Sequence, residues 1–225
     1  MTMRNNHSPR CTFQYKYFDA APETVPPQVL NIGSCDDPLG FGVKAMHFDI
    51  DDWSAACKYF TRGNAEELPF PDGSYHTVIM GDMLEHVKNP WLCVQEAARV
   101  VAPGGVLVIT IFEEWRLPGH GQWIKEGQEL ADETCRKMGF TDREDFQVKS
   151  FPNRVGTPDD DVNPHLIHIN QFDDDDIKGL CLGVMNMHGG FSEIEFVKAG
   201  EATHEGHTWY NWLLAFRKGE EGGAA

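Results

Sequence analysis

The segment formed by residues 63–110 constrains the fold of this chain more than any other part of the sequence. It contains two short apolar runs rich in β-branched residues, at 77–80 and 106–109, which are typical of strands buried on both faces. Between them, apolar side chains recur every three or four residues over 90–101, which predicts a helix with one apolar face. The Pro-Gly-Gly at 103–105 is expected to end that helix. The segment therefore predicts a strand–helix–strand unit with parallel strands.

The charge balance limits which partners are expected. Nineteen basic residues stand against 35 acidic ones, giving a formal net charge of -16. This argues against general affinity for nucleic acids or anionic lipids, because binding to them requires clustered Lys and Arg. No apolar run approaches the roughly 18 residues that a membrane helix needs, and the first 18 residues lack the apolar core of a secretory signal. We expect neither a membrane span nor a secretory leader.

The six cysteines are widely spaced and form no C-x-x-C pair, so neither a disulfide framework nor a zinc site is expected. They are interpreted as reduced thiols of a cytoplasmic protein. Cys93, on the helix predicted at 90–101, is interpreted as a small packed residue.

Two earlier segments predict further strands of the same sheet. Residues 29–32 are apolar and end at Gly33, where a glycine lets the backbone approach a ligand at the carboxyl edge of a parallel sheet. Residues 45–51 follow after a connection that is too short for a full crossover helix. Asp49, at the end of this second strand, can accept hydrogen bonds from ribose hydroxyls, or it can cap a following helix.

These elements occur in a recognisable order. After the glycine loop and the strand ending in Asp49 come NAEELPFPDGSY at 64–75, LEHV at 84–87 and RVVAPGG at 99–105. This arrangement resembles class I S-adenosylmethionine-dependent methyltransferases. The resemblance implies an α/β fold: a Rossmann-like seven-stranded sheet, mostly parallel with the last strand antiparallel, with helices on both faces and an inserted lid segment. The implied divisions are an N-terminal arm or flap (1–27), a methyltransferase domain (28–218, with the substrate or lid region at 139–170) and a disordered tail (219–225).

The resemblance also implies a site for S-adenosylmethionine, with S-adenosylhomocysteine as the product. Gly33 and Ser34 would approach the methionine portion of the cofactor, and Asp49 would hold the ribose hydroxyls. The adenine would lie beside Asn64 and Ala65, and the sulfonium would lie above a floor of Gly81, Asp82 and Met83. Cys35, Ile50 and Glu66 are assigned to the same cofactor site.

The acceptor side is predicted from residues nearer the C-terminus. Trp115 and Arg116, after the strand at 106–109, are expected at the substrate wall, together with His165 from the inserted region. Candidates for a general base are His86, His120 and His168, because histidine titrates near neutrality. No metal site is expected, since His165 and His168 lie in an alternating run that would separate their side chains. A helix that starts after Asp173, with acidic residues in its first turn, is expected to continue to residue 187. A hairpin at 192–198 and 208–216 is expected to complete the domain.

The function predicted is methyl transfer to an oxygen, nitrogen or carbon nucleophile of a small molecule or peptide. An alternative is a catalytically inactive methyltransferase-fold protein that serves as a binding or scaffold partner. It is favoured by Ser34-Cys35-Asp36-Asp37, which stand where the family has further glycines. An enzyme using NAD or a nucleotide sugar is disfavoured because no G-x-G-x-x-G opens a helix after the first strand. The sequence leaves the oligomeric state open.

Overall fold

A seven-stranded sheet forms the centre of the computed structural model, which describes residues 8–35, 37–113, 172, 174–187, 190–202 and 208–220. The spatial order of the strands is β3-β2-β1-β4-β5-β7-β6. Their bounds are β1 Val29–Ile32, β2 Ala45–Asp49, β3 Phe60–Arg62, β4 Tyr75–Gly81, β5 Val101–Glu113, β6 Phe191–Ala202 and β7 Thr208–Lys218. The neighbours from β3 to β5 pair in parallel, whereas β7 is antiparallel to both β5 and β6. The predicted sheet, including its antiparallel last strand, is confirmed.

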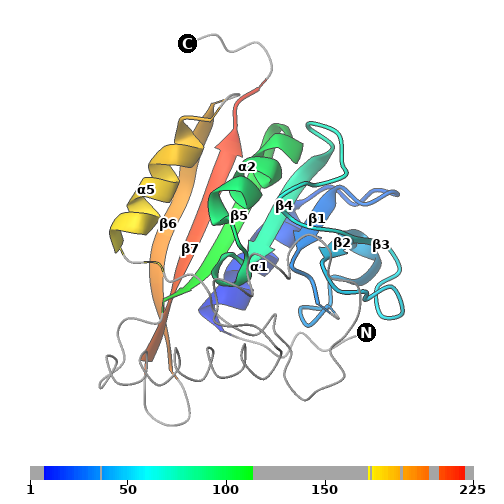
Figure 1. Ribbon diagram of the computed structural model, residues 1–225, viewed down its shortest axis with the longest axis horizontal. Coiled ribbons are helices and arrows are strands. Elements are labelled where there is room, and N and C mark those ends of the chain that lie inside the picture. Colours follow the sequence, from blue (N-terminus) through cyan, green and yellow to red (C-terminus); the bar gives the residue numbers. More distant parts are fainter. Residues whose placement is uncertain are drawn as a thin grey trace, which may run out of the picture.

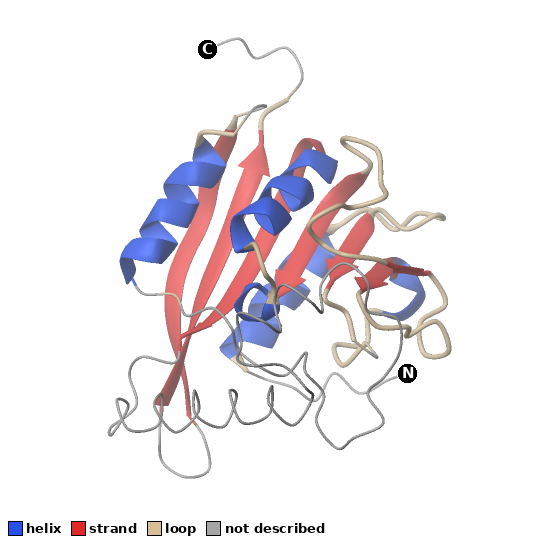
Figure 2. Cartoon of the chain, in the orientation of Figure 1, coloured by secondary structure: helices blue, strands red, loops and turns tan. Residues whose placement is uncertain are grey.

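Helices cover both faces of this sheet (Figures 1 and 2). Helix α1 (Pro9–Ala20) lies on one face, and α2 (Pro90–Val100) and α5 (Asp174–Met185) lie on the other. Two 3-10 turns, η1 (Gly42–Lys44) and η2 (Leu84–His86), complete the described helical elements. None of the described helices is both long and apolar enough to cross a membrane.

The strand β4 shows how the sheet separates two hydrophobic clusters. Its side chains alternate between the faces, so Val78 and Met80 pack with α2 and α5, while Ile79 packs with the aromatic side chains of α1. All three residues are fully buried. This burial on both faces accounts for the continuous apolar run in the sequence.

The start of β5 differs from the prediction. Helix α2 ends at Val100, and Val101 already pairs with Tyr75 of β4, so the helix ends before the Pro-Gly-Gly. The register shifts between Tyr75 and Thr77, and the Pro-Gly-Gly lies in this irregular start of the strand. Gly105 is required there because a Cβ would lie 2.6 Å from the carbonyl oxygen of His76.

The N-terminal segment, predicted as an arm or flap, contains helix α1. Pro9 begins α1, and the Ser8 hydroxyl caps it by accepting a hydrogen bond from the Cys11 amide at 3.2 Å. Phe13, Tyr17 and Phe18 are buried against the sheet. The inserted region predicted at 139–170 and residues 221–225 of the predicted tail lie outside the described residues.

Candidate functional site

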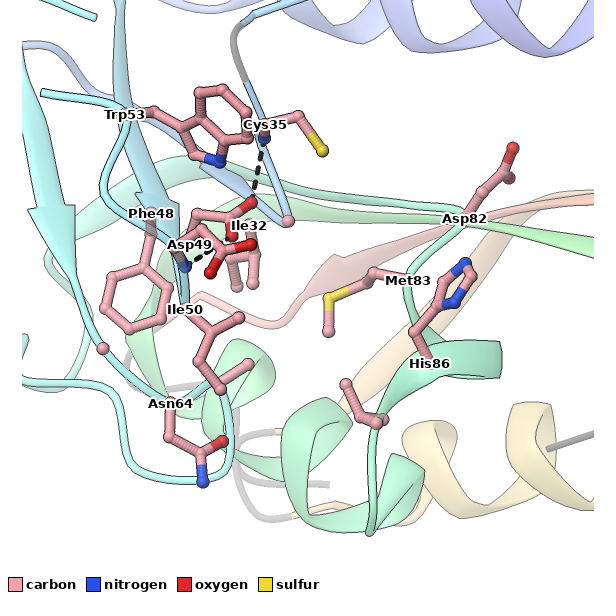
Figure 3. A pocket seen from close by; sticks show the side chains of 15 residues that line it. Ile32, Cys35, Phe48, Asp49, Ile50, Trp53, Asn64, Asp82, Met83 and His86 are labelled. Atoms are coloured by element: carbon pink, nitrogen blue, oxygen red, sulfur yellow. Dashed lines mark hydrogen bonds between the residues drawn. The ribbon is translucent and has the colours of Figure 1, made fainter. Parts of the chain in front are cut away.

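A cavity of about 260 Å³ opens at the carboxyl ends of the parallel strands (Figure 3). This is the edge at which open α/β sheets bind their ligands. Its volume is near the lower end of the roughly 300 to 1,000 Å³ usual for small-molecule pockets. The lining residues follow β1, β2, β3 and β4: Ile32, Gly33, Cys35, Phe48, Asp49, Ile50, Asp51, Trp53, Gly63, Asn64, Ala65, Asp82, Met83, His86 and Val87.

Asp49 is the last residue of β2, and its carboxylate is held by two backbone amides. Oδ2 accepts a hydrogen bond from the Cys35 amide at 2.9 Å, and Oδ1 accepts one from the Asp51 amide at 3.0 Å. A carboxylate has two oxygens that can each accept more than one hydrogen bond, which is the chemistry needed to receive vicinal hydroxyl groups. The described chain after β2 forms turns and then β3, so Asp49 does not cap a following helix, which excludes that alternative.

Gly33 ends β1 with a φ of +71°, a conformation that favours glycine. A Cβ at this position would also lie 2.9 Å from the Cβ of Met83. Its amide donates to the carbonyl oxygen of Phe48 at 2.9 Å. A Cβ on Gly63 would lie 2.7 Å from a carbon of the Phe48 ring. The two glycines therefore let the backbone pack directly against Met83 and Phe48, which both line the cavity.

In the loop after Gly33, two residues other than glycine adopt left-handed conformations. Cys35 has a φ of +45° and Asp37 a φ of +61°. The Asp37 carboxylate accepts hydrogen bonds from the amides of Phe41 at 2.9 Å and Gly42 at 2.7 Å. Asp37, which stands where the family has a further glycine, therefore stabilises its own loop and does not extend into the cavity.

The floor of the cavity is formed by the turn after β4. Asp82 has a φ of +48°, uncommon for a residue other than glycine. Its Oδ1 accepts a hydrogen bond from the Thr110 hydroxyl at 2.7 Å, and its Oδ2 forms an ion pair with Arg10. Thr110 in turn accepts a hydrogen bond from the Gln14 side-chain amide at 2.9 Å. Helix α1 therefore reaches the floor through two side chains.

Asn64 and Ala65 form one wall of the cavity, and Glu66, which does not line the cavity, holds this wall in place. The Asn64 side-chain oxygen accepts a hydrogen bond from the Glu66 amide at 3.0 Å. Glu66 Oε1 accepts one from the amide of Asn89, whose side chain caps α2 by accepting from Leu92 at 3.1 Å. Glu66 therefore connects this wall to the start of α2.

The structure brings together most of the residues that the sequence assigned to the cofactor. Gly33, Cys35, Asp49, Ile50, Asn64, Ala65, Asp82 and Met83 line the cavity, together with His86. Ser34, Glu66 and Gly81 are described but do not line it. The assigned residues Trp115, Arg116, His120, His165 and His168 lie outside the described residues.

Several lining residues were missed by sequence reasoning: Ile32, Phe48, Asp51, Trp53, Gly63 and Val87. Phe48 is a buried strand residue in the sequence pattern, and nothing there distinguishes its cavity-facing ring from core packing. Gly63 gave a usable signal, because it directly precedes the Asn64-Ala65 motif.

Two titratable side chains outside the cavity lining, Cys93 and Tyr75, are packed in the core. Burial raises the pKa of the Cys93 thiol, as expected for the packed residue that the sequence predicted. Burial also raises the pKa of Tyr75 to about 12. Among the described residues, no group of three or more His, Cys, Asp or Glu side chains is placed to hold a metal ion.

Comparison of the fold with solved structures identifies its class. The YcgJ protein of Bacillus subtilis superposes with a TM-score of 0.57 at 13% identity, covering 93% of this chain and 99% of that protein. A SAM-dependent methyltransferase from Methanosarcina mazei gives a TM-score of 0.56 at 17% identity, covering 92% and 97%. The fold is that of the Rossmann-like class I methyltransferases.

Comparison of sequences finds the similarity to methyltransferases in the part of the chain that contains the motifs. Residues 46–109 match the family model described as a methyltransferase domain. An uncharacterized methyltransferase of Mycobacterium sp. strain JLS is 33% identical over 97 residues, which cover 41% of this chain and 38% of that protein. One from Mycobacterium tuberculosis is 29% identical over 124 residues, covering 50% and 48%. The chain spans less than half the length of these curated relatives. The class I methyltransferase resemblance predicted from the sequence is confirmed.

Proposed function

We propose that this protein is an S-adenosylmethionine-dependent methyltransferase that transfers a methyl group to an oxygen, nitrogen or carbon nucleophile of a small molecule or peptide. The observation that carries the proposal is the position of Asp49. Its carboxylate ends β2 at the rim of a cavity, beside the glycine turn that ends β1. That pairing of a strand-end acid with a glycine turn suits a ligand bearing a ribose.

The residues present fit this cofactor. Gly33 and Gly63 let the backbone pack directly against Met83 and Phe48, two side chains of the cavity lining. Phe48, Ile50 and Ala65 supply an apolar surface for a planar base. Among the described residues, the cavity lining includes the carboxylates of Asp49 and Asp51 and no Lys or Arg, which suits a ligand that carries a positive charge.

When bound, the cofactor supplies a methyl group on a sulfonium that is already activated for transfer. The protein then has to bind the cofactor and the acceptor, orient them toward each other and exclude water. Asp49 is placed to hold the ribose, and Met83, 7% exposed, closes the floor with an apolar side chain. His86 lines the cavity and is the described candidate for accepting a proton from a hydroxyl acceptor.

The relatives do not define the acceptor. One structural neighbour, from Thermotoga maritima, is described as a possible histamine N-methyltransferase, with a TM-score of 0.56 at 14% identity. A likeness at this identity extends to the fold, so we propose the acceptor only as a class of nucleophile. A catalytically inactive scaffold protein remains the alternative. Asp37 favours this alternative less than its position in the sequence suggested, because its carboxylate accepts hydrogen bonds from amides of its own loop.

The first test is calorimetric titration with S-adenosylmethionine and S-adenosylhomocysteine. We expect micromolar binding that Asp49→Asn weakens at least tenfold, about 1.4 kcal/mol. Asp52→Asn is the matched control, because it removes one negative charge three positions along the chain. The Asp52 side chain is exposed and does not line the cavity. Binding that both variants leave unchanged would contradict the assigned role of Asp49.

The second test is release of S-adenosylhomocysteine from S-adenosylmethionine in the presence of a panel of amines, phenols, carboxylic acids and peptides. Stimulated release by one acceptor class identifies the reaction. Tight cofactor binding without release for any class supports the scaffold alternative, and absence of cofactor binding refutes the proposed function.

A further inference from the structure

We propose that Arg10 and Gln14 of helix α1 are positioning residues for the cofactor site, acting through the carboxylate of Asp82. The inference rests on the proposed function, because the affected property is cofactor affinity. It starts from the unusual backbone of Asp82, which has a φ of +48° at the point where β4 gives way to the cavity floor.

The left-handed conformation of Asp82 shapes the floor. It turns the chain between Gly81 and Met83, so that Met83 packs against Gly33 and leaves no room for a side chain there. Such conformations cost free energy for residues other than glycine and persist where the surrounding structure holds them. The contacts that hold Asp82 therefore also hold the position of Met83.

Three protein groups hold Asp82. Its backbone amide donates to the carbonyl oxygen of Thr110 at 2.9 Å, and the Thr110 hydroxyl donates to Oδ1 at 2.7 Å. The Arg10 guanidinium pairs with Oδ2. In Figure 3 the Asp82 side chain points away from Met83 and His86. The carboxylate thus faces α1 while the next residue faces the cavity.

Gln14 fixes the direction of the Thr110 hydroxyl. Its side-chain amide donates to Thr110 Oγ1 at 2.9 Å, which leaves the hydroxyl proton for Asp82. Gln14 is 2% exposed and Thr110 is fully buried, so water does not compete effectively for these bonds. A Cβ on Gly81 would lie 2.6 Å from Gln14 Nε2, so the end of β4 is shaped to admit this side chain.

The consequence is coupling between helix docking and the cofactor site. If α1 holds the floor in its binding conformation, a bound cofactor must in turn stabilise the docked helix by the same free energy. Arg10 is half-buried, with a side chain 33% exposed, whereas Gln14 is 2% exposed, so changing Arg10 disturbs the core less than changing Gln14.

The experiment compares Arg10→Gln with Lys16→Gln by calorimetric titration with S-adenosylhomocysteine. Both variants remove one positive charge from α1, but Lys16 pairs with Glu195 on β6 and lies outside the network. We expect Arg10→Gln to weaken binding at least fivefold, Lys16→Gln to change it less than twofold, and Arg10→Lys to recover part of the loss. Circular dichroism establishes that each variant is folded.

Asp82→Gly provides the readout that a merely structural role would not affect. Glycine adopts the left-handed conformation without the carboxylate contacts, so Arg10→Gln should cause no further loss of affinity in this background. An equal loss in both backgrounds, or none in the parent, would overturn the positioning role. If the parent chain binds no S-adenosylhomocysteine, both this inference and the proposed function fail; if it binds and Arg10→Gln has no effect, only the inference fails.

Discussion

The conservative substitution Arg99→Lys should destabilise the protein strongly, because the guanidinium of Arg99 connects α2 to the segment that follows the cavity wall. Nε and one terminal nitrogen donate to Glu96 at 2.8 and 2.7 Å. The terminal nitrogens also donate to the carbonyl oxygens of Phe70 at 2.8 Å and Leu68 at 3.0 Å, and to Asp72 at 2.8 Å. A lysine ammonium keeps the charge but cannot form this planar fork.

The expected cost follows from the individual contacts. Each carbonyl hydrogen bond contributes about 1 kcal/mol, and reducing the bidentate Glu96 pair to a single contact costs about another 1 kcal/mol. The pair with Asp72 adds little, because that carboxylate is 82% exposed. The sum is about 3 kcal/mol, which for a chain of this size lowers Tm by roughly 6 to 12 °C.

Thermal unfolding followed by circular dichroism measures this effect, and urea unfolding gives the free energy. Asp72→Asn is the internal control: it removes the exposed partner and leaves the carbonyl contacts, so it should cost less than about 0.5 kcal/mol. The reasoning is refuted if Arg99→Lys costs under 1 kcal/mol, or if Asp72→Asn costs as much as Arg99→Lys.

Three further substitutions test other contacts. Gly33→Ala should lower both Tm and cofactor affinity, since it adds a left-handed strain of about 1–2 kcal/mol and a Cβ 2.9 Å from that of Met83; Gly190→Ala, at φ +59° with nothing within 4 Å, isolates the strain in the same thermal scan. Lys218→Met should cost about 1–3 kcal/mol in urea unfolding, because the ammonium donates to three carbonyl oxygens around the end of α2. The hydrogen bond from the Arg99 guanidinium lowers the pKa of Glu96. The ionised Glu96 therefore contributes its full stabilisation of the folded state above the ordinary pKa near 4.5, and this stabilisation is lost as pH falls through the pKa of the folded state. Glu96→Gln should therefore lose less stability than the parent between pH 6 and 3.5.

The sheet was predictable because its signal is local. The runs at 77–80 and 106–109 became β4 and β5, and 29–32 became β1 with the same bounds. Burial on both faces leaves such strands almost entirely apolar, so the pattern is visible without knowledge of their neighbours. β3 was not predicted, since its three residues are half-buried or exposed and include Arg62.

The candidate cofactor site could be predicted where it depends on chain order. Asp49 and Gly33 were assigned to it because each lies at the end of a buried strand, and parallel strands place their carboxyl ends at one edge. The contacts among Arg10, Asp82 and Thr110 were not predictable. They join parts of the chain that lie 72 and 28 positions apart, and no local periodicity records such a pairing.

The residues of the recognisable motifs divide between the cavity and the scaffold. Some line the cavity, namely Asn64, Ala65, His86 and Val87, whereas others stabilise the surrounding fold. Arg99 and Glu96 hold the segment 68–72, and Glu66 holds the start of α2. These side chains do not line the cavity, so their presence reports a fold prepared for a cofactor rather than a particular acceptor.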